Sequence, residues 1–151
     1  MSLYTAIDEQ LKEAMKAKNR VALDALRGLR SVIKNKEIEL HRKLEDKEII
    51  QLIAKQIKQR EEAIALYKKG NRPDLVEKES QEIEVLRQFM PPPISEEELI
   101  ERLKSIIDEV GASGPRDMGK VMKVAMEQLA GRVEGKVVSE MVKGLLSEIS
   151  N

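Results

Sequence analysis

Three consecutive prolines at positions 91–93 constrain the fold of this chain more than any other feature. Proline lacks the backbone N–H that a helix requires and fixes φ at about −65°, so no helix can run through this segment. Three prolines in a row instead favour an extended, stiff conformation. We therefore expect two subdomains, residues 1–90 and 95–151, joined by a proline linker at 91–94.

Apolar residues recur at helical spacing along almost the whole chain. In the segment 19–42, for example, Ala22, Leu26 and Ile33 fall on one side of a helix. Aromatic residues make up only 2% of the chain, and no segment shows a competing strand pattern. The sequence therefore predicts an all-α protein with an N-terminal four-helix part and a C-terminal three-helix bundle.

Local signals mark the helix ends. Gly70 ends one helix and Pro73 begins the next, which predicts an antiparallel hairpin. After the linker, Ser95 and Glu98 have the spacing of a capping box. The expected helices span about residues 2–18, 19–42, 46–70, 73–90 and 96–110, followed by a sixth from Pro115 and a seventh after Gly135.

The composition excludes several classes of site. The chain has no cysteine, which excludes disulfides, thiolate nucleophiles and zinc–cysteine centres and fits a reducing compartment. No apolar run approaches the length of a membrane span, and the N-terminus lacks the plan of a signal peptide. We therefore expect a cytoplasmic protein with no membrane partner.

Charge is unevenly distributed, although the formal net charge is zero. Residues 16–36 carry a net +6 and residues 77–101 a net −6. This polarity favours one face that binds a polyanion and another that repels it. The alternative is that the two segments lie side by side and neutralise each other, and the sequence favours neither.

The basic segment places four cations on one face of its helix. They are Arg20, Arg27, Arg30 and Lys34. At about 100° per residue they fall within a sector of about 80°, away from most of the apolar residues. Such a row suits a line of phosphates, whereas the scarcity of aromatic residues argues against a protein that reads single strands. A solvated face that pairs with glutamates of the fourth helix is the alternative.

No catalytic residue, metal site or cofactor site is predicted. The chain has neither a Walker-type nor a dinucleotide-binding glycine motif. Its single histidine, His41, lies in a charged stretch without a marked nucleophile, so we interpret it as a surface residue. The many carboxylates lie beside lysines and arginines on solvated helix faces.

Two patterns indicate structural roles. Arg60 occupies an apolar position of the third helix, where we expect it to pair with Glu79 or Glu82 of the fourth. Methionines repeat every four residues between positions 118 and 126, which favours core packing over a groove for a partner.

The segment 131–136, with the sequence GRVEGK, has two interpretations. Its glycines leave backbone amides accessible beside a helix start, where the helix dipole favours an anion, and Arg132 and Lys136 flank that start. Alternatively, both glycines only permit a tight turn, and the residues alone favour this second interpretation.

These segments together resemble the YqeY family over essentially the whole chain. The C-terminal ones resemble the motif that YqeY proteins share with the tail of GatB, a subunit of the transfer RNA-dependent amidotransferase. The matching segments are 26–35, 70–75 (GNRPDL), 88–91 (QFMP), 95–99 (SEEEL), 118–122 (MGKVM), 131–136 and 142–143.

The resemblance implies two helical subdomains and a link to transfer RNA. In GatB the related tail helps to hold transfer RNA, while a separate body, which this sequence does not contain, carries out the chemistry. Carried over by motif position, contacts with the RNA backbone would fall on Lys120, Arg132, Lys136 and Lys143. One departure weakens them, because residues 126–130 (MEQLA) replace a family segment that commonly has a proline and basic residues.

Three functions follow as hypotheses. The first is a non-catalytic accessory module that binds transfer RNA or a protein of the aminoacylation machinery, with no DNA partner and no cofactor. The second is an enzyme that acts as a carbon–nitrogen ligase with glutamine as nitrogen donor, although no nucleophile is marked out for it. The third is an adaptor for protein–protein interaction.

Overall fold

The computed structural model describes residues 2–129 and 131–150. Within these ranges the chain forms seven α-helices, one short 3₁₀ helix and no strand, which confirms the all-α prediction. None of the described helices is both long and apolar enough to cross a membrane. The chain divides into two compact units, Met1–Met90 and Pro91–Asn151, and each has an apolar core of its own.

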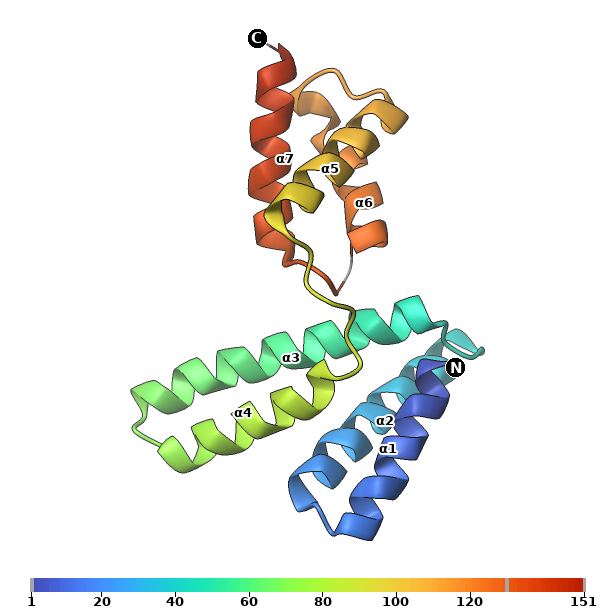
Figure 1. Cartoon of the computed structure of the whole chain (residues 1–151), viewed down its shortest axis with the longest axis vertical. Coiled ribbons are helices and arrows are strands. Elements are labelled where there is room, and N and C mark those ends of the chain that lie inside the picture. The colour runs from blue at the N-terminus through green and yellow to red at the C-terminus, as the bar shows by residue number, and fades with distance from the viewer. Residues whose placement is uncertain (1, 130, 151) are drawn as a thin grey trace. The chain divides into compact units, whose positions relative to one another are not determined.

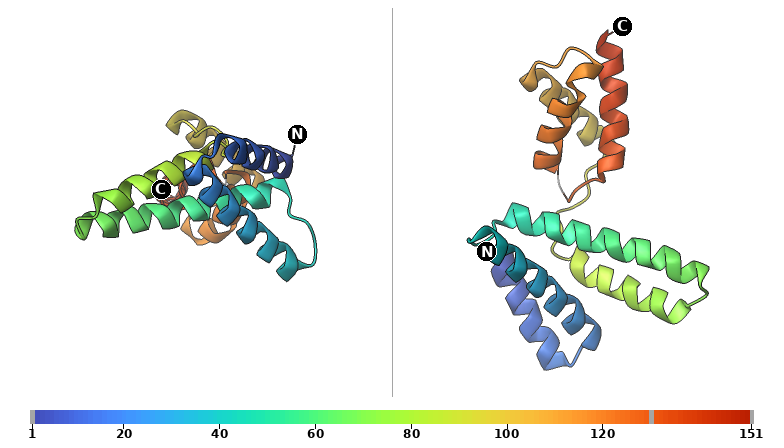
Figure 2. Two further views of the ribbon diagram at one scale, coloured as in Figure 1. Left: turned by 90° about the horizontal axis from the view of Figure 1, so that it is seen from below. Right: turned by 180° about the vertical axis from the view of Figure 1, so that it is seen from behind.

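The first unit consists of two antiparallel helix pairs (Figure 1). Its helices are α1 (Leu3–Ala17), α2 (Arg20–Leu40), α3 (Asp46–Lys69) and α4 (Pro73–Arg87). α3 lies alongside α4 and α1 alongside α2, and α2 also packs against α4 (Figures 1 and 2). The hairpin expected around Gly70 is present, because α3 ends there and α4 begins at Pro73.

Large aliphatic side chains fill the core of the first unit. The fully buried ones are Ile7, Leu26, Leu29, Ile33, Ile49, Ile53 and Leu86. Burial of each side chain of this size stabilises the folded state by roughly 1.5–3 kcal/mol. Each of the four helices supplies at least one of them, so each is stabilised by this core. The expected cap of α2 is also present, because the side chain of Asn19 accepts the Ala22 N–H at 3.1 Å.

The second unit contains three α-helices. They are α5 (Glu96–Val110), α6 (Met118–Leu129) and α7 (Gly135–Ser150), with a 3₁₀ helix (Pro115–Asp117) before α6. Their fully buried side chains are Leu103, Ile106, Val121, Ala125, Leu129, Val138, Val142 and Leu146. The three methionines of α6 pack against this core while partly buried, as their spacing predicts.

The structure differs from the prediction at one helix start and one helix end. Pro115 begins a 3₁₀ turn instead of the sixth α-helix, because the Asp117 carboxylate accepts the Ser113 N–H at 2.9 Å and tightens the chain there. α4 ends at Arg87 instead of near Met90, and the backbone turns through Phe89 before the prolines. A residue before proline is disfavoured in helical conformation, so the helix stops early.

Only half of the capping box predicted at the start of α5 is present. The Ser95 hydroxyl accepts the Glu98 N–H at 3.2 Å, as expected. The Glu98 carboxylate, however, lies 3.5 Å from the guanidinium of Arg132. The residue that was expected to complete the cap therefore contacts the turn between α6 and α7.

Candidate functional site

The four predicted cations of α2 lie on its accessible side. Arg20, Arg27 and Lys34 are exposed, and the side chain of Arg30 is 35% exposed. Arg20 pairs with Asp24 one turn away at 3.7 Å. Within the described part of the chain, Arg27 and Lys34 make no ion pair. The face is thus accessible, and two of its four charges have no counterion among the described residues.

The basic segment lies beside the part of the acidic segment that α4 carries, but no ion pair of the described residues joins the two helices. α2 packs against α4, as the alternative interpretation of the charge pattern required. In the described ranges, however, the ion pairs of α2 go to α1, to α2 itself or to the α2–α3 connection. Of the predicted row on α2, Arg27 and Lys34 therefore remain available for other partners within the described chain.

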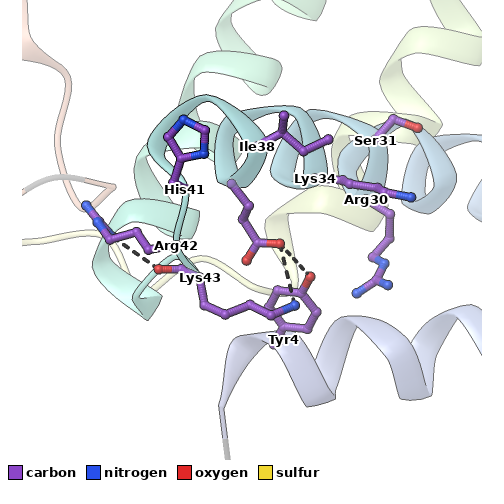
Figure 3. A pocket seen from close by; sticks show the side chains of 9 residues that line it. Tyr4, Arg30, Ser31, Lys34, Ile38, His41, Arg42 and Lys43 are labelled. Atoms are coloured by element: carbon purple, nitrogen blue, oxygen red, sulfur yellow. Dashed lines mark hydrogen bonds and ion pairs between the residues drawn. The ribbon is translucent and has the colours of Figure 1, made fainter.

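A depression of about 620 Å³ lies at the C-terminal end of this basic face (Figure 3). Its walls come from the first turn of α1, the second half of α2 and the connection that follows α2. The lining residues are Tyr4, Arg30, Ser31, Lys34, Glu37, Ile38, His41, Arg42 and Lys43. Four of them are formal cations and one is a carboxylate, so the depression is suited to an anion.

Glu37 fastens the three walls of the depression together. Its Oε1 accepts the Tyr4 hydroxyl at 3.0 Å, and its Oε2 accepts the Leu44 N–H at 3.1 Å. Partial burial favours the neutral acid, but the hydrogen bonds from Leu44 and Tyr4 and the charges of Lys43 and Arg30 outweigh it and lower the pKa of Glu37. The carboxylate is therefore ionised at neutral pH, and both of its oxygens are engaged.

Two cations lie against the ring of Tyr4. The guanidinium carbon of Arg30 is 4.8 Å from the ring centroid, and the ammonium of Lys43 is 5.1 Å from it. Both distances allow cation–π attraction. Arg30 Nη1 also lies 2.9 Å from Asp8 Oδ1, but without hydrogen-bond geometry, and this buried nitrogen has no hydrogen-bond partner in the described chain. The same ring thus attracts two positive charges.

Arg42 has a different role from the other cations of the depression. It donates to both oxygens of Glu48, at 2.8 and 2.9 Å, and to the Lys43 carbonyl at 3.1 Å. The hydrogen bonds from Arg42, with one from the Glu45 N–H, lower the pKa of Glu48 to about 2. Arg42 therefore fastens the α2–α3 connection to α3, and its charge is already matched.

The depression was not found by sequence reasoning. His41, Arg42 and Lys43 follow a helix end directly, and this cluster was a usable signal. Tyr4 gave no such signal, because its contact with Glu37 joins residues that are far apart in the sequence.

In the second unit, Arg132 is engaged by the protein's own backbone. Its Nε donates to the carbonyl of Pro92 at 3.1 Å, and its own carbonyl accepts the Ile94 N–H, also at 3.1 Å. Its Nη2 lies 3.5 Å from Glu98, and the side chain is only 24% exposed. Arg132 thus fastens the proline segment to the turn before α7.

The three lysines proposed for RNA contact do not form one cluster with Arg132. Lys136 and Lys143 are exposed and lie two turns apart on α7, on the same side and roughly 10 Å from each other. Lys120 lies in the first turn of α6, 4.0 Å from Asp117, and therefore roughly 14 Å along the helix from its end at Leu129. Only Lys136 and Lys143 are both exposed and close to each other.

The glycines around Arg132 fit the interpretation as a tight turn. Gly131 has φ +83°, a left-handed conformation that other residues rarely adopt. A Cβ at Gly135 would make only an ordinary contact, 3.6 Å from the Met126 side chain. Of residues 126–130, which depart from the family pattern, Ala130 lies outside the described residues. Among the residues that are described, no cluster of three or more acidic or histidine side chains could hold a metal ion.

Comparison with known proteins gives one family and several relatives. The family described as Yqey-like protein matches residues 4–146. A protein of Kluyveromyces lactis is 34% identical over 141 residues, which cover 91% of this chain and 72% of the relative. A protein of Clavispora lusitaniae is 30% identical over 153 residues, which cover 98% and 89%. One of Lachancea thermotolerans is 38% identical, with 72% of this chain and 60% of the relative covered.

All three relatives carry the name "Altered inheritance of mitochondria protein 41, mitochondrial". The name places those fungal proteins in mitochondria, whereas the composition of this chain led us to expect the cytoplasm.

Proposed function

The chain belongs to the Yqey-like protein family, and from this premise we propose that it is a non-catalytic accessory module that binds transfer RNA through its phosphate backbone. The observation that carries the proposal is the accessible row of cations on α2, which continues into a cation-lined depression. The choice of transfer RNA follows from the likeness to the GatB tail.

The spacing of the cations supports a contact with a nucleic-acid backbone. Arg27 and Lys34 are seven residues apart on α2, which corresponds to roughly 10 Å along the helix. A DNA strand presents a phosphate about every 3.4 Å of duplex axis, so roughly 10 Å spans about three phosphates and each of the two cations can meet one without reading a base. Backbone contacts of this kind also suit a chain that is poor in aromatic residues.

In the second unit, Lys136 and Lys143 are the residues that we propose as RNA contacts. Both are exposed, and neither has an ion pair in the described ranges. Arg132 is left out of this set because Pro92 and Glu98 occupy its guanidinium. Lys120, near Asp117, is a weaker candidate.

Salt dependence of binding tests the proposal. Fluorescence anisotropy of the full chain with total transfer RNA would be measured at 50 and 200 mM salt. Three phosphate contacts lower the affinity roughly 40-fold between these concentrations, and we expect at least this loss. If no binding is seen at 50 mM salt, the proposal fails.

Two further measurements define the partner and the location. Retrieval of a protein of the aminoacylation machinery after nuclease treatment, without RNA binding, would replace transfer RNA by a protein partner. We propose the cytoplasm as the location, since a chain without cysteine fits a reducing compartment. The relatives are named as mitochondrial proteins, so fractionation of the source cells would decide between the two compartments.

A further inference from the structure

We propose that the depression at the end of α2 binds a single phosphate group, held by Arg30, Lys34 and Lys43. If the phosphate belongs to RNA, the inference rests on the proposed function and deepens it. A phosphate of a small molecule has the same chemistry, and the experiment below separates the two sources.

The three cations come from different directions. Arg30 and Lys34 project from α2, and Lys43 extends from the connection after α2 toward the Tyr4 ring, from the side opposite to Arg30 in the view of Figure 3. A phosphate group has oxygens pointing in several directions and can accept from all three side chains. A carboxylate accepts mainly within the plane of its two oxygens, whereas the tetrahedral oxygens of a phosphate also accept from donors outside one plane. The arrangement therefore favours phosphate over an acidic side chain.

The site is held in place before a ligand arrives. The Tyr4 ring carries Arg30 and Lys43 at 4.8 and 5.1 Å, and the Tyr4 hydroxyl is fixed by its hydrogen bond to Glu37. Side chains that are already positioned lose less conformational entropy on binding. Arg30 and Lys43 differ from surface lysines that have no such contact, because the Tyr4 ring restricts their positions.

The carboxylates nearby do not satisfy the three cations. Glu37 lies 3.8 Å from Lys43, whose side chain is 81% exposed, so water and salt screen that pair. Asp8 takes one nitrogen of Arg30, and Glu48 is occupied by Arg42. Lys34 has no ion pair within the described chain. A bound phosphate would meet Lys34, Lys43 and the remaining donors of Arg30.

The first test uses inorganic phosphate and the full chain. Amide chemical shifts would be followed by NMR during a phosphate titration, with chloride at matched ionic strength as the reference. We expect saturable shifts at the amides of residues 30–43. The variant Lys34→Gln/Lys43→Gln should lose saturation, whereas Lys58→Gln, which removes an exposed charge from α3 outside the depression, should keep it. Absence of saturable shifts in the unaltered chain would overturn the inference.

The second test identifies the source of the phosphate. With transfer RNA we expect the double variant to bind roughly tenfold more weakly at low salt and with a salt slope smaller by about two. If transfer RNA binds the double variant and Lys58→Gln equally well, the site assignment fails and the proposed function stands. If inorganic phosphate binds but transfer RNA does not, the site stands with a small phosphorylated ligand and the proposed function falls. Circular dichroism would verify that both variants remain folded.

Discussion

Arg60 and Arg132 each fasten two elements together, one in each unit, but with partners of different kinds. Arg60 Nη1 donates to Glu79 at 3.1 Å and to Glu82 at 2.6 Å, and Glu82 is buried. Arg132 donates to a backbone carbonyl and approaches the half-exposed Glu98. The first arginine therefore compensates a buried charge, and the second stabilises a surface turn.

From this difference we infer that burial of the partner, more than the number of contacts, decides how much an arginine contributes to the free energy of unfolding. A buried carboxylate that loses its cation remains desolvated and uncompensated, whereas a backbone carbonyl at the surface finds water instead. Among the residues whose burial is described, Glu82 is the only buried charged one, so the second unit has no counterpart to it.

The largest expected effect comes from Arg60→Leu. This change leaves Glu82 buried without its partner, and we expect the free energy of unfolding of the first unit to fall by about 3–5 kcal/mol. Urea unfolding would measure it. Arg87→Leu is the matched control, because it removes an exposed pair with Glu61 that contributes about 0–1 kcal/mol.

A second change separates charge compensation from packing. In the variant Arg60→Met/Glu82→Leu both charges are gone, and most of the lost stability should return. If Arg60→Leu alone costs less than about 1 kcal/mol, the distinction drawn between the two arginines is wrong.

A smaller effect is expected for Arg132→Ala. Removal of the hydrogen bond to Pro92 should lower the stability of the second unit by about 1–2 kcal/mol, in the range for a bond with one charged partner that is partly exposed. Faster hydrogen exchange at Ile94 should accompany the loss. Arg132→Lys keeps the charge but not the fork of donors, so it should destabilise similarly. If Arg132→Lys is as stable as the unaltered chain, the hydrogen bond from the Arg132 guanidinium to Pro92 is not what stabilises the second unit.

A still smaller effect is expected for Glu98→Gln. The carboxylate is 44% exposed and 3.5 Å from Arg132, so its loss should change stability by no more than about 0.5 kcal/mol. Thermal unfolding at low and high salt would measure it. A large loss that salt abolishes would place Glu98, instead of Pro92, as the main partner of Arg132.

The smallest difference appears only in acid and has opposite signs at Asp117 of the second unit and Glu82 of the first. Hydrogen bonds from Ser113 lower the pKa of Asp117 below its ordinary 3.8, so its contribution to stability is present above that pH and is lost as the pH falls further. Burial raises the pKa of Glu82 despite Arg60, so protonation of Glu82 favours the folded state as the pH falls. Acid titrations of Asp117→Asn and Glu82→Gln should therefore deviate from the unaltered chain in opposite directions.

The fold was largely predictable because its signals are local. Helix periodicity and three prolines gave an all-α chain, and the apolar position of Arg60 was enough to predict its pairing with Glu79 and Glu82, which the structure confirms. The 3₁₀ turn at Pro115 was missed, because it depends on a hydrogen bond from Ser113 to a carboxylate that spacing does not reveal.

The site was less predictable because its contacts join distant residues. Tyr4 meets Glu37 across 33 positions, and Arg132 meets Pro92 across 40. No periodicity encodes such pairs. The exposed row on α2 was foreseen, whereas the depression at its end needed the packing of α1 against α2. Whether these cations bind RNA stays a prediction.

The hairpin of α3 and α4 has a consequence for the order of folding. The two helices are joined through Gly70, Asn71 and Arg72 alone, so closing them into contact costs little chain entropy. Their interface can form as soon as both helices exist, and the same holds for α1 and α2, which are joined through Lys18 and Asn19 alone, whereas α2 must find α4 over a longer stretch of chain. We therefore expect residues within the α3–α4 hairpin to have higher φ-values than residues at the interface of α2 with α4, which should form later.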